Sequence, residues 1–207
     1  TPVTNTATNL YYYCVVSGDC TPAVTSSFSG LITVSPTTVA GTASASETTI
    51  CNGDTTVLSL TGETGTIQWQ SSSDNSTWTD ITGETANSYT TPALTALTYY
   101  RAEVTSGYCP SETSNVVTIT VNELPAITAQ PSTSTQNLCQ NDTPTDLSIT
   151  ATGTNITYQW YSNTSESTTA ATTITGATSA SYTPVTNTAT NLYYYCVVSG
   201  DCTPAVT

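Results

Sequence analysis

The first 25 residues of this chain recur, without a single difference, as its last 25. Thr1–Thr25 reads TPVTNTATNLYYYCVVSGDCTPAVT, and Thr183–Thr207 reads the same. Identity over such a length does not arise by chance, so the chain returns to its starting point after a period of 182 residues. Repetition of this kind is the signature of a repeat architecture. We therefore expect the chain to be a window on a longer tandem array.

Each period contains two diverged copies of one domain. The matching motifs are CNGDT at 51–55 with CQNDT at 139–143, IQW at 67–69 with YQW at 158–160, and SGYC at 106–109 with SGDC at 199–202. Prolines near the end of each copy mark the boundaries. We predict three parts: residues 1–35 as the C-terminal part of a type B domain, residues 36–123 as a complete type A domain, and residues 124–207 as a type B domain lacking its last strand.

The hydrophobic pattern predicts an all-β chain. Short runs of β-branched and aromatic residues alternate with clusters of Gly, Pro, Asn and Ser, and about seven runs per domain are typical of an antiparallel sandwich. We expect tandem immunoglobulin-like β-sandwiches arranged end to end. Strand alternation places the following side chains in the two cores: Leu58, Leu60, Ile67, Trp69, Tyr100, Ala102, Val104, Val117, Ile119 and Val121 in type A, and Leu147, Ile149, Tyr158, Trp160, Tyr194, Cys196 and Val198 in type B.

The charge of the chain limits its partners. Fourteen Asp and Glu face a single cation, Arg101, which gives a net charge of −13. Nucleic acid is excluded as a partner because phosphate binding depends on Lys and Arg. An anionic membrane surface is disfavoured for the same reason, and no apolar run is long enough for direct membrane insertion. Neighbouring repeats of the same protein remain the natural partners.

The cysteines predict disulfide bonds and export to an oxidising, extracytoplasmic compartment. The chain has no His and no CxxC pair, which argues against a zinc site, and we predict no metal ligands. Matched positions in the two domains predict the pairs Cys51–Cys109 and Cys139–Cys202. Cys196 would then be a free, buried thiol. The alternative is a Cys139–Cys196 bond that leaves Cys202 free for an intermolecular link.

The carboxylates favour structure over chemistry. They lie singly in turns or on outward strand positions, and no His or Lys is present as a catalytic partner, so we predict no catalytic residues and no enzyme activity. No cofactor is expected. Calcium is the one alternative, although its candidate oxygen donors do not follow a spaced loop motif. These donors are Asn52, Asp54, Asp74, Asn75, Asn141 and Asp142.

An outward-facing group of tyrosines is the candidate ligand contact. Tyr193 and Tyr195 point outward from one strand, and Tyr161 extends the patch if its strand is the neighbour. Tyrosine offers rigid, amphipathic contact area. The other interpretations are that these rings cover the junction with the next domain or simply decorate a sheet.

The type A sequence resembles a known family. It carries, in order, the CNGD turn, the IQW strand, the stretch ITGETANSYT at 81–90 and the strand YYRA at 99–102. In these it is similar to the Ig-like repeats of very large secreted surface proteins of the Bacteroidetes, including the flavobacterial SprB-type gliding-motility adhesins. The resemblance implies type IX secretion, a filament attached to the outer membrane, and O-glycosylation, for which Thr55 is the candidate here.

We therefore expect a non-catalytic repeat region of a cell-surface adhesin filament, acting as a stalk and as a multivalent adhesive surface toward an extracellular surface or polysaccharide. The alternative is an array of carbohydrate-binding Ig-like modules attached to a secreted polysaccharide-degrading enzyme. We also expect Ser26–Ser35 of one chain to complete the domain at 124–207 of another, or of the same continuous array.

Overall fold

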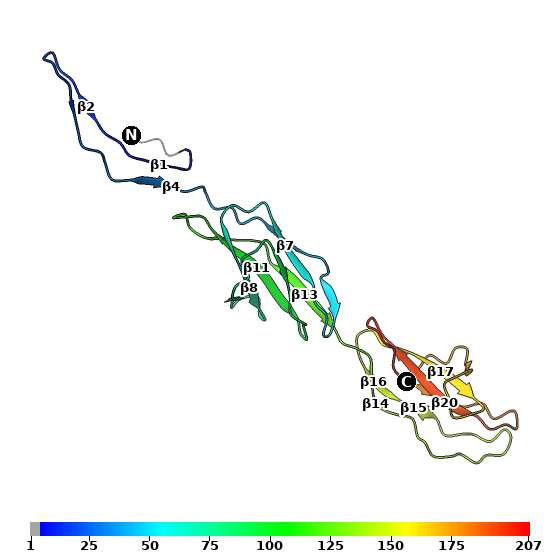
Figure 1. The fold of residues 1–207 in the computed structure, drawn as a ribbon. Coiled ribbons are helices and arrows are strands. Elements are labelled where there is room, and N and C mark those ends of the chain that lie inside the picture. The colour runs from blue at the N-terminus through cyan, green and yellow to red at the C-terminus, as the bar shows by residue number, and fades with distance from the viewer. Residues whose placement is uncertain (1–4) are drawn as a thin grey trace. The chain divides into compact units, whose positions relative to one another are not determined.

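The structure, a computed structural model, describes residues 5–207, and every regular element in them is a β-strand. The all-β prediction is confirmed. No helix long and apolar enough to cross a membrane occurs in these residues. Two compact units are present (Figure 1). The first contains the chain up to Thr48, with Thr55–Pro92 and Leu97–Ile119, and the second contains Thr49–Asp54, Ala93–Ala96 and Thr120–Thr207.

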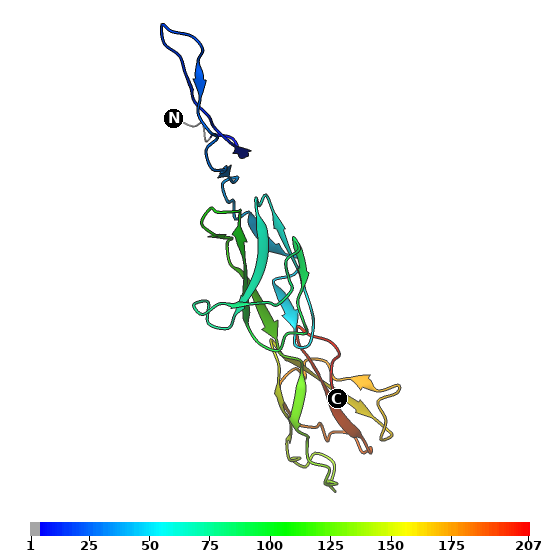
Figure 2. The same cartoon turned by 60° about the vertical axis from the view of Figure 1, so that its left-hand side comes forward.

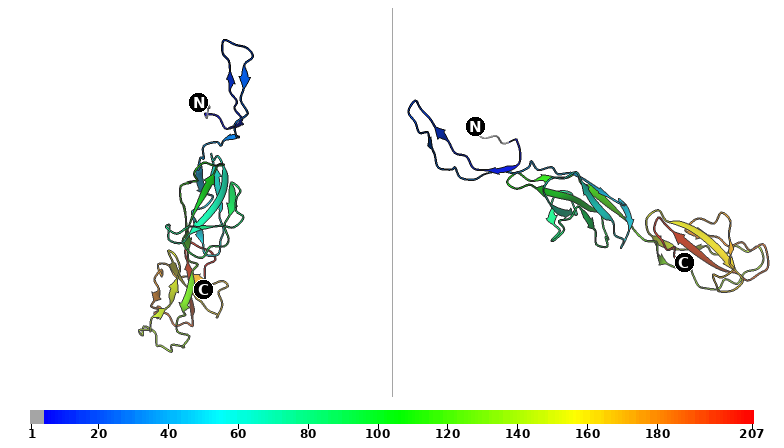
Figure 3. Two further views of the ribbon diagram at one scale, coloured as in Figure 1. Left: turned by 90° about the vertical axis from the view of Figure 1, so that its left-hand side faces the viewer. Right: turned by 45° about the horizontal axis from the view of Figure 1, so that its top comes forward.

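The N-terminal residues of the first unit form a long two-stranded hairpin. Its strands pair as β1 (Thr8–Leu10) with β4 (Ile32–Val34) and as β2 (Val15–Val16) with β3 (Val24–Thr25). Between these pairs, Ser26 N donates to Cys14 O at 2.8 Å and Ser29 N donates to Tyr12 O at 2.7 Å. The two arms, drawn in blue, run side by side in Figure 3.

The rest of the first unit is a sandwich of two sheets (Figure 2). One sheet has the order β10-β7-β5, with bounds Ser88–Thr90, Val57–Thr61 and Thr42–Ala45. The other has the order β13-β11-β8-β9, with β12 also on β11, and bounds Val117–Asn122, Thr98–Thr105, Thr66–Ser72, Thr79–Asp80 and Glu112–Thr113.

The alternation of each strand decides which side chains fill this sandwich. Trp69 is fully buried, and its Nε1 donates to the carbonyl of Ala86 at 2.9 Å, so the polar edge of the indole is satisfied. The other predicted core residues of this domain are buried as well, apart from Val121, which is half-buried near the end of β13. The prediction of the core from period-2 alternation is therefore confirmed for these strands.

The second unit repeats the pattern with shorter strands. Its strand pairs and their bounds are β14 (Ala126–Ala129) with β16 (Thr150–Thr152), β15 (Leu147–Ser148) with β19 (Ser181–Tyr182), β18 (Thr172–Thr173) with β17 (Thr157–Asn163), and β17 with β20 (Tyr193–Ser199). β6 (Thr49–Cys51) also belongs to this unit and lies parallel to the end of β13, with Cys51 opposite Asn122.

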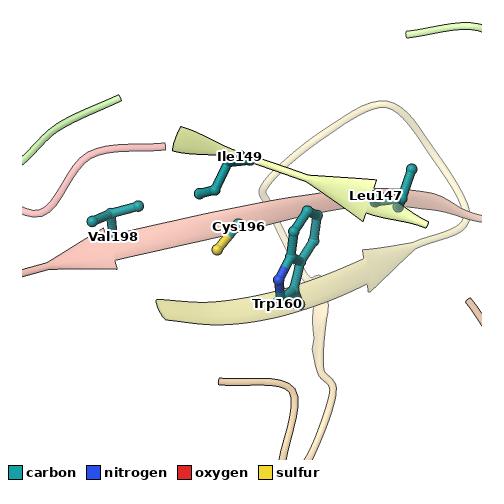
Figure 4. Packing of buried hydrophobic residues seen from close by; sticks show 5 residues of the cluster. All are labelled: Leu147, Ile149, Trp160, Cys196 and Val198. Carbon is teal, nitrogen blue, oxygen red and sulfur yellow. The ribbon is translucent and has the colours of Figure 1, made fainter. Parts of the chain in front are cut away.

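The core of the second unit surrounds Trp160. Its ring lies beside Cys196, facing the segment of Leu147 and Ile149 (Figure 4). The indole Nε1 donates to Ser179 O at 2.9 Å, the counterpart of the Trp69 bond. The predicted core residues are buried except Tyr158 and Tyr194, which are partly buried and pack against the cluster; Leu147, Ile149, Trp160, Cys196 and Val198 form its centre.

Candidate interaction surface

The outward face of β17 and β20 carries a stacked pair of tyrosines. Tyr161 and Tyr195 lie directly opposite each other in the antiparallel register, with ring centroids 5.1 Å apart and ring planes inclined by 7°. Both rings are half-buried. Tyr193, two residues before Tyr195 on the same face, is 49% exposed and lies opposite Asn163. The three tyrosines predicted from the sequence thus lie on two adjacent strands.

A short loop is fixed beside the tyrosine pair. The hydroxyl of Tyr195 donates to the carbonyl of Thr168 at 3.3 Å. Asn163 Nδ2 donates to the carbonyls of Ser167 at 2.6 Å and Thr169 at 3.0 Å. These bonds hold the loop after β17 against the same face and use the polar end of Tyr195. What remains for a ligand is the apolar side of the rings, which suits stacking rather than polar recognition.

The first unit has different side chains at the two positions equivalent to the tyrosine pair. Gln70 and Arg101 are the counterparts of Tyr161 and Tyr195, and Arg101 Nε donates to Gln70 Oε1 at 2.8 Å. The guanidinium carbon of Arg101 lies 4.2 Å from the ring centroid of Trp78, a cation–π contact. Gln70 Nε2 in turn donates to Asp80 Oδ1 at 2.8 Å. The two domains therefore present a polar face and an aromatic face from one scaffold.

Trp78 is the member of this surface that the sequence analysis missed. It immediately precedes β9, which pairs with β8 at Gln70 and Ser71. The sequence could have indicated this contact, because alternation places Arg101 outward and a Trp at the end of an adjacent hairpin is within reach of it. The predicted interaction patch is thus matched, in the first unit, by an arginine covered by a tryptophan.

The predicted disulfide pairs are wrong. We expected Cys51–Cys109 and Cys139–Cys202, but the bond present joins Cys51 to Cys202, with a Cα–Cα separation of 5.8 Å. Cys109 and Cys139 are free. The reason is geometric: the pairing of β6 with the end of β13 places Cys51 opposite Asn122, and the sulfur of Cys202 also lies 3.7 Å from the carbonyl oxygen of Asn122. Cys51 and Cys202 belong to the same compact unit.

Cys196 is a free thiol in the core of the second unit and is 3% exposed. Burial raises the pKa of this thiol, since the thiolate would lose its hydration, while a backbone hydrogen bond at Gln159 acts in the opposite direction. The alternative Cys139–Cys196 bond is absent, because both sulfurs are free.

The hairpin exposes side chains that the second copy of the same sequence buries. Cys196 and Val198 are 3% and 0% exposed, whereas Cys14 is exposed and Val16 is 64% exposed. The other exposed apolar residues of the hairpin are Leu10, Tyr11, Tyr13, Val15, Val24, Phe28 and Leu31. Exposed apolar residues gathered on one hairpin are typical of an interaction site.

β20 also has an open edge. In the first unit β11 lies between β8 and β13, with Tyr99 and Tyr100 opposite Thr118 and Val117. In the second unit β20 ends its sheet, and among the described residues only the bridge between Val198 and Val206 lies beyond it. The unpaired backbone at the start of β20 is a template for one more strand.

Asp74 stabilises a turn. Asp74 accepts hydrogen bonds from Thr77 N at 2.7 Å, Ser76 N at 2.8 Å and Ser72 Oγ at 2.9 Å. These donors, the Thr77 amide first, lower the pKa of Asp74 to about 2. No cluster of three His, Cys, Asp or Glu side chains suited to a metal ion occurs in residues 5–207. Calcium at the six oxygen donors named above stays an untested alternative.

The hollow over Ile174–Val185 has a volume of about 340 Å³, and half of its lining residues are Thr or Ser. Tyr182 is its one titratable lining residue, and burial raises the pKa of that phenol.

Comparison with known proteins identifies the fold and the family. The chain is similar to the titin I-band fragment I67–I69 (12% identity, TM-score 0.54) and to its E-to-A variant (12%, 0.52), covering 93% of this chain and 70% of each fragment. The chain is also similar to extracellular domains 3–5 of Drosophila OTK (15% identity, TM-score 0.46), covering 92% of this chain and 66% of that one.

The two titin likenesses confirm the Ig-like fold and say nothing more. No curated protein sequence matches the chain. One family model matches it twice, over residues 39–123 and 128–207, and so over most of its length. The chain therefore belongs to the family described as a domain of unknown function, DUF8696.

Proposed function

We propose that this chain is a non-catalytic repeat section of a long cell-surface adhesin filament. In this role the Ig-like domains extend the filament and present a weak binding surface many times over, so that adhesion depends on multivalency rather than on one tight site. The resemblance to gliding-motility adhesins extends the proposal to type IX secretion, outer-membrane attachment and a polysaccharide or other extracellular surface as the target. Thr55 is exposed, as an O-glycosylated residue must be.

This proposal rests on the different environments of the two copies of the repeated sequence. In its second copy the sequence supplies β20, a strand of the sheet that holds Trp160, and Cys196 and Val198 are buried; in its first copy the equivalent side chains are exposed. The exposed hairpin matches what a preceding type B domain would cover. Tandem repetition accounts for both the hairpin and the open edge of β20. The hairpin lacks the earlier strands of a type B domain, which the second unit has, and the second unit lacks the last strand, which the hairpin has.

Small-angle scattering tests the stalk. The measurement compares the 207-residue chain with one lengthened by a period, in which residues 26–207 follow Thr207. Each added domain should lengthen the particle by roughly 35–45 Å, from strands of about six residues at about 3.3 Å each plus loops. A maximum dimension that hardly grows with the added period would contradict the stalk.

The stacked tyrosines favour one second candidate, a carbohydrate-binding module. Sugar rings stack on apolar aromatic faces, and Tyr161 with Tyr195 is such a face. Glycan-array binding by the chain, lost in Tyr195→Ala, would support this function. Tyr13→Ala is the matched control, because Tyr13 is the copy of Tyr195 in the hairpin and contacts Phe28 instead of a second tyrosine.

A further inference from the structure

The bonded cysteine Cys51 and the free cysteine Cys139 lie at the start of the same turn. Asp54 N donates to Cys51 O at 2.9 Å, and Asp142 N donates to Cys139 O at 3.1 Å. The third residue has a positive φ in both, 94° at Gly53 and 71° at Asn141. Gly53 N donates to Leu94 O at 2.8 Å, and Asn141 N donates to Thr186 O at 3.0 Å. The exposed Cys139 therefore lies at the same point of its turn as the half-buried Cys51 does.

Cys202 and Cys109 also share their surroundings. The sulfur of Cys202 lies 3.7 Å from the carbonyl oxygen of Asn122, and the sulfur of Cys109 lies 3.9 Å from that of Ser35. Ser35 and Asn122 are equivalent, since each follows the matching strand ends ITV at 32–34 and 119–121. Cys109 thus occupies the position of Cys202, without a partner sulfur in residues 5–207.

The position of Asn122 explains why Cys51 is bonded to Cys202. Cys51 lies opposite Asn122 in the parallel pairing of β6 with β13, and this brings it to Cys202 beside the same Asn122. If periods follow one another, the equivalence of the turns places a Cys139 opposite Ser35, beside Cys109. That Cys139 belongs to the preceding period, since in the array a segment equivalent to Ser26–Ser35 closes each type B domain.

We infer that Cys139 of one period forms a disulfide with Cys109 of the next, as Cys51 does with Cys202. The inference rests on the tandem array proposed above. The two thiols lose two protons and two electrons in forming the S–S bond, and the oxidant is a disulfide-bearing thiol oxidoreductase or a small disulfide such as oxidised glutathione, which is reduced to two thiols. Four of the five cysteines of each period are then bonded, and Cys196 stays a buried thiol.

The 207-residue chain gives the first test. After refolding with oxidised and reduced glutathione, peptide mapping should find Cys51 bonded to Cys202, and Cys109 and Cys139 of the monomer should both be alkylated. A bond between Cys109 and Cys139 within one monomer would contradict the inference, because it would make the pair internal to a period.

The decisive test uses the chain lengthened by one period, with residues 26–207 following Thr207. Cys139 of the first period and Cys109 of the second should be recovered as one disulfide-linked peptide and lose their alkylation. Cys139→Ser in the first period should restore alkylation of that Cys109, whereas Cys196→Ser should leave the map unchanged. Full alkylation of both, with Cys51–Cys202 formed in each period, would overturn the inference. Small-angle scattering on the same sample tests the stalk proposal independently of this disulfide.

Discussion

Val16 and Val198 occupy the same position in two identical stretches of sequence, yet Val16 is 64% exposed and Val198 is fully buried. Local sequence therefore does not decide the environment of this residue. What differs is the packing: Val198 lies in the cluster around Trp160, whereas none of the buried residues within 5–207 belongs to the hairpin.

Val198→Asp and Val16→Asp should differ sharply in effect. A carboxylate at Val198 would be buried without a partner, and we expect the free energy of unfolding of the second unit to fall by about 3 kcal/mol or more. Val16→Asp should change it by less than about 0.5 kcal/mol, as at other exposed sites. Denaturant unfolding followed by tryptophan fluorescence measures both. Equal effects would mean that the hairpin is covered in solution.

Removing the Cys51–Cys202 bond should weaken the second unit. We expect Cys202→Ser to lower its free energy of unfolding by about 2–5 kcal/mol, because the bond closes a long loop in the unfolded chain. Cys20→Ser is the control, since Cys20 is the repeat copy of Cys202 and is free and exposed. It should have an effect of less than about 0.5 kcal/mol. Unfolding curves of the oxidised variants make the comparison.

The stacked tyrosines should be energetically coupled. A double-mutant cycle with Tyr161→Ala and Tyr195→Ala should give a coupling energy of about 0.5–1.5 kcal/mol, the usual range for an aromatic pair. The parallel cycle of Tyr161→Ala with Tyr13→Ala should be additive, because the Tyr13 ring contacts Phe28. Stability is read from denaturant midpoints. An uncoupled Tyr161–Tyr195 pair would mean that the rings do not stack in solution.

The first unit should lose stability at alkaline pH through Tyr100. Burial, with Tyr89 nearby, raises the pKa of this phenol from 10.0 to about 12. The folded state thus favours the neutral form: its contribution is complete below pH 10.0 and is lost as the pH rises through about 12. Unfolding midpoints of alkylated protein across this window should fall, and Tyr100→Phe should flatten the decline. An unchanged slope in that variant would refute the assignment.

Several features could be predicted because they depend on local pattern. Alternation along a strand puts Trp69 and Trp160 on the face that is buried once the sheet is packed, and turn residues such as Gly53 and Asn141 mark where strands end. The face carrying Tyr193 and Tyr195 follows from the same alternation. Tyr161 joined them because its strand is the neighbour, which the sequence left as a condition.

Other features depend on distance in space. Equivalent positions within a domain suggested Cys51–Cys109, but a disulfide needs sulfurs that meet, and the register of β6 with β13 brings Cys51 to Cys202 across 151 residues. The contact of Arg101 with Trp78 likewise depends on where a hairpin end lies over a sheet.

The sequence by itself determined the repeat, the all-β Ig-like fold and the inward face of each strand, because a period of two residues is a property of the backbone. Only the tertiary structure decided which cysteines are bonded and which copy of the repeated segment is buried. Both depend on the strands packed alongside, and identical residues take different environments when those neighbours differ.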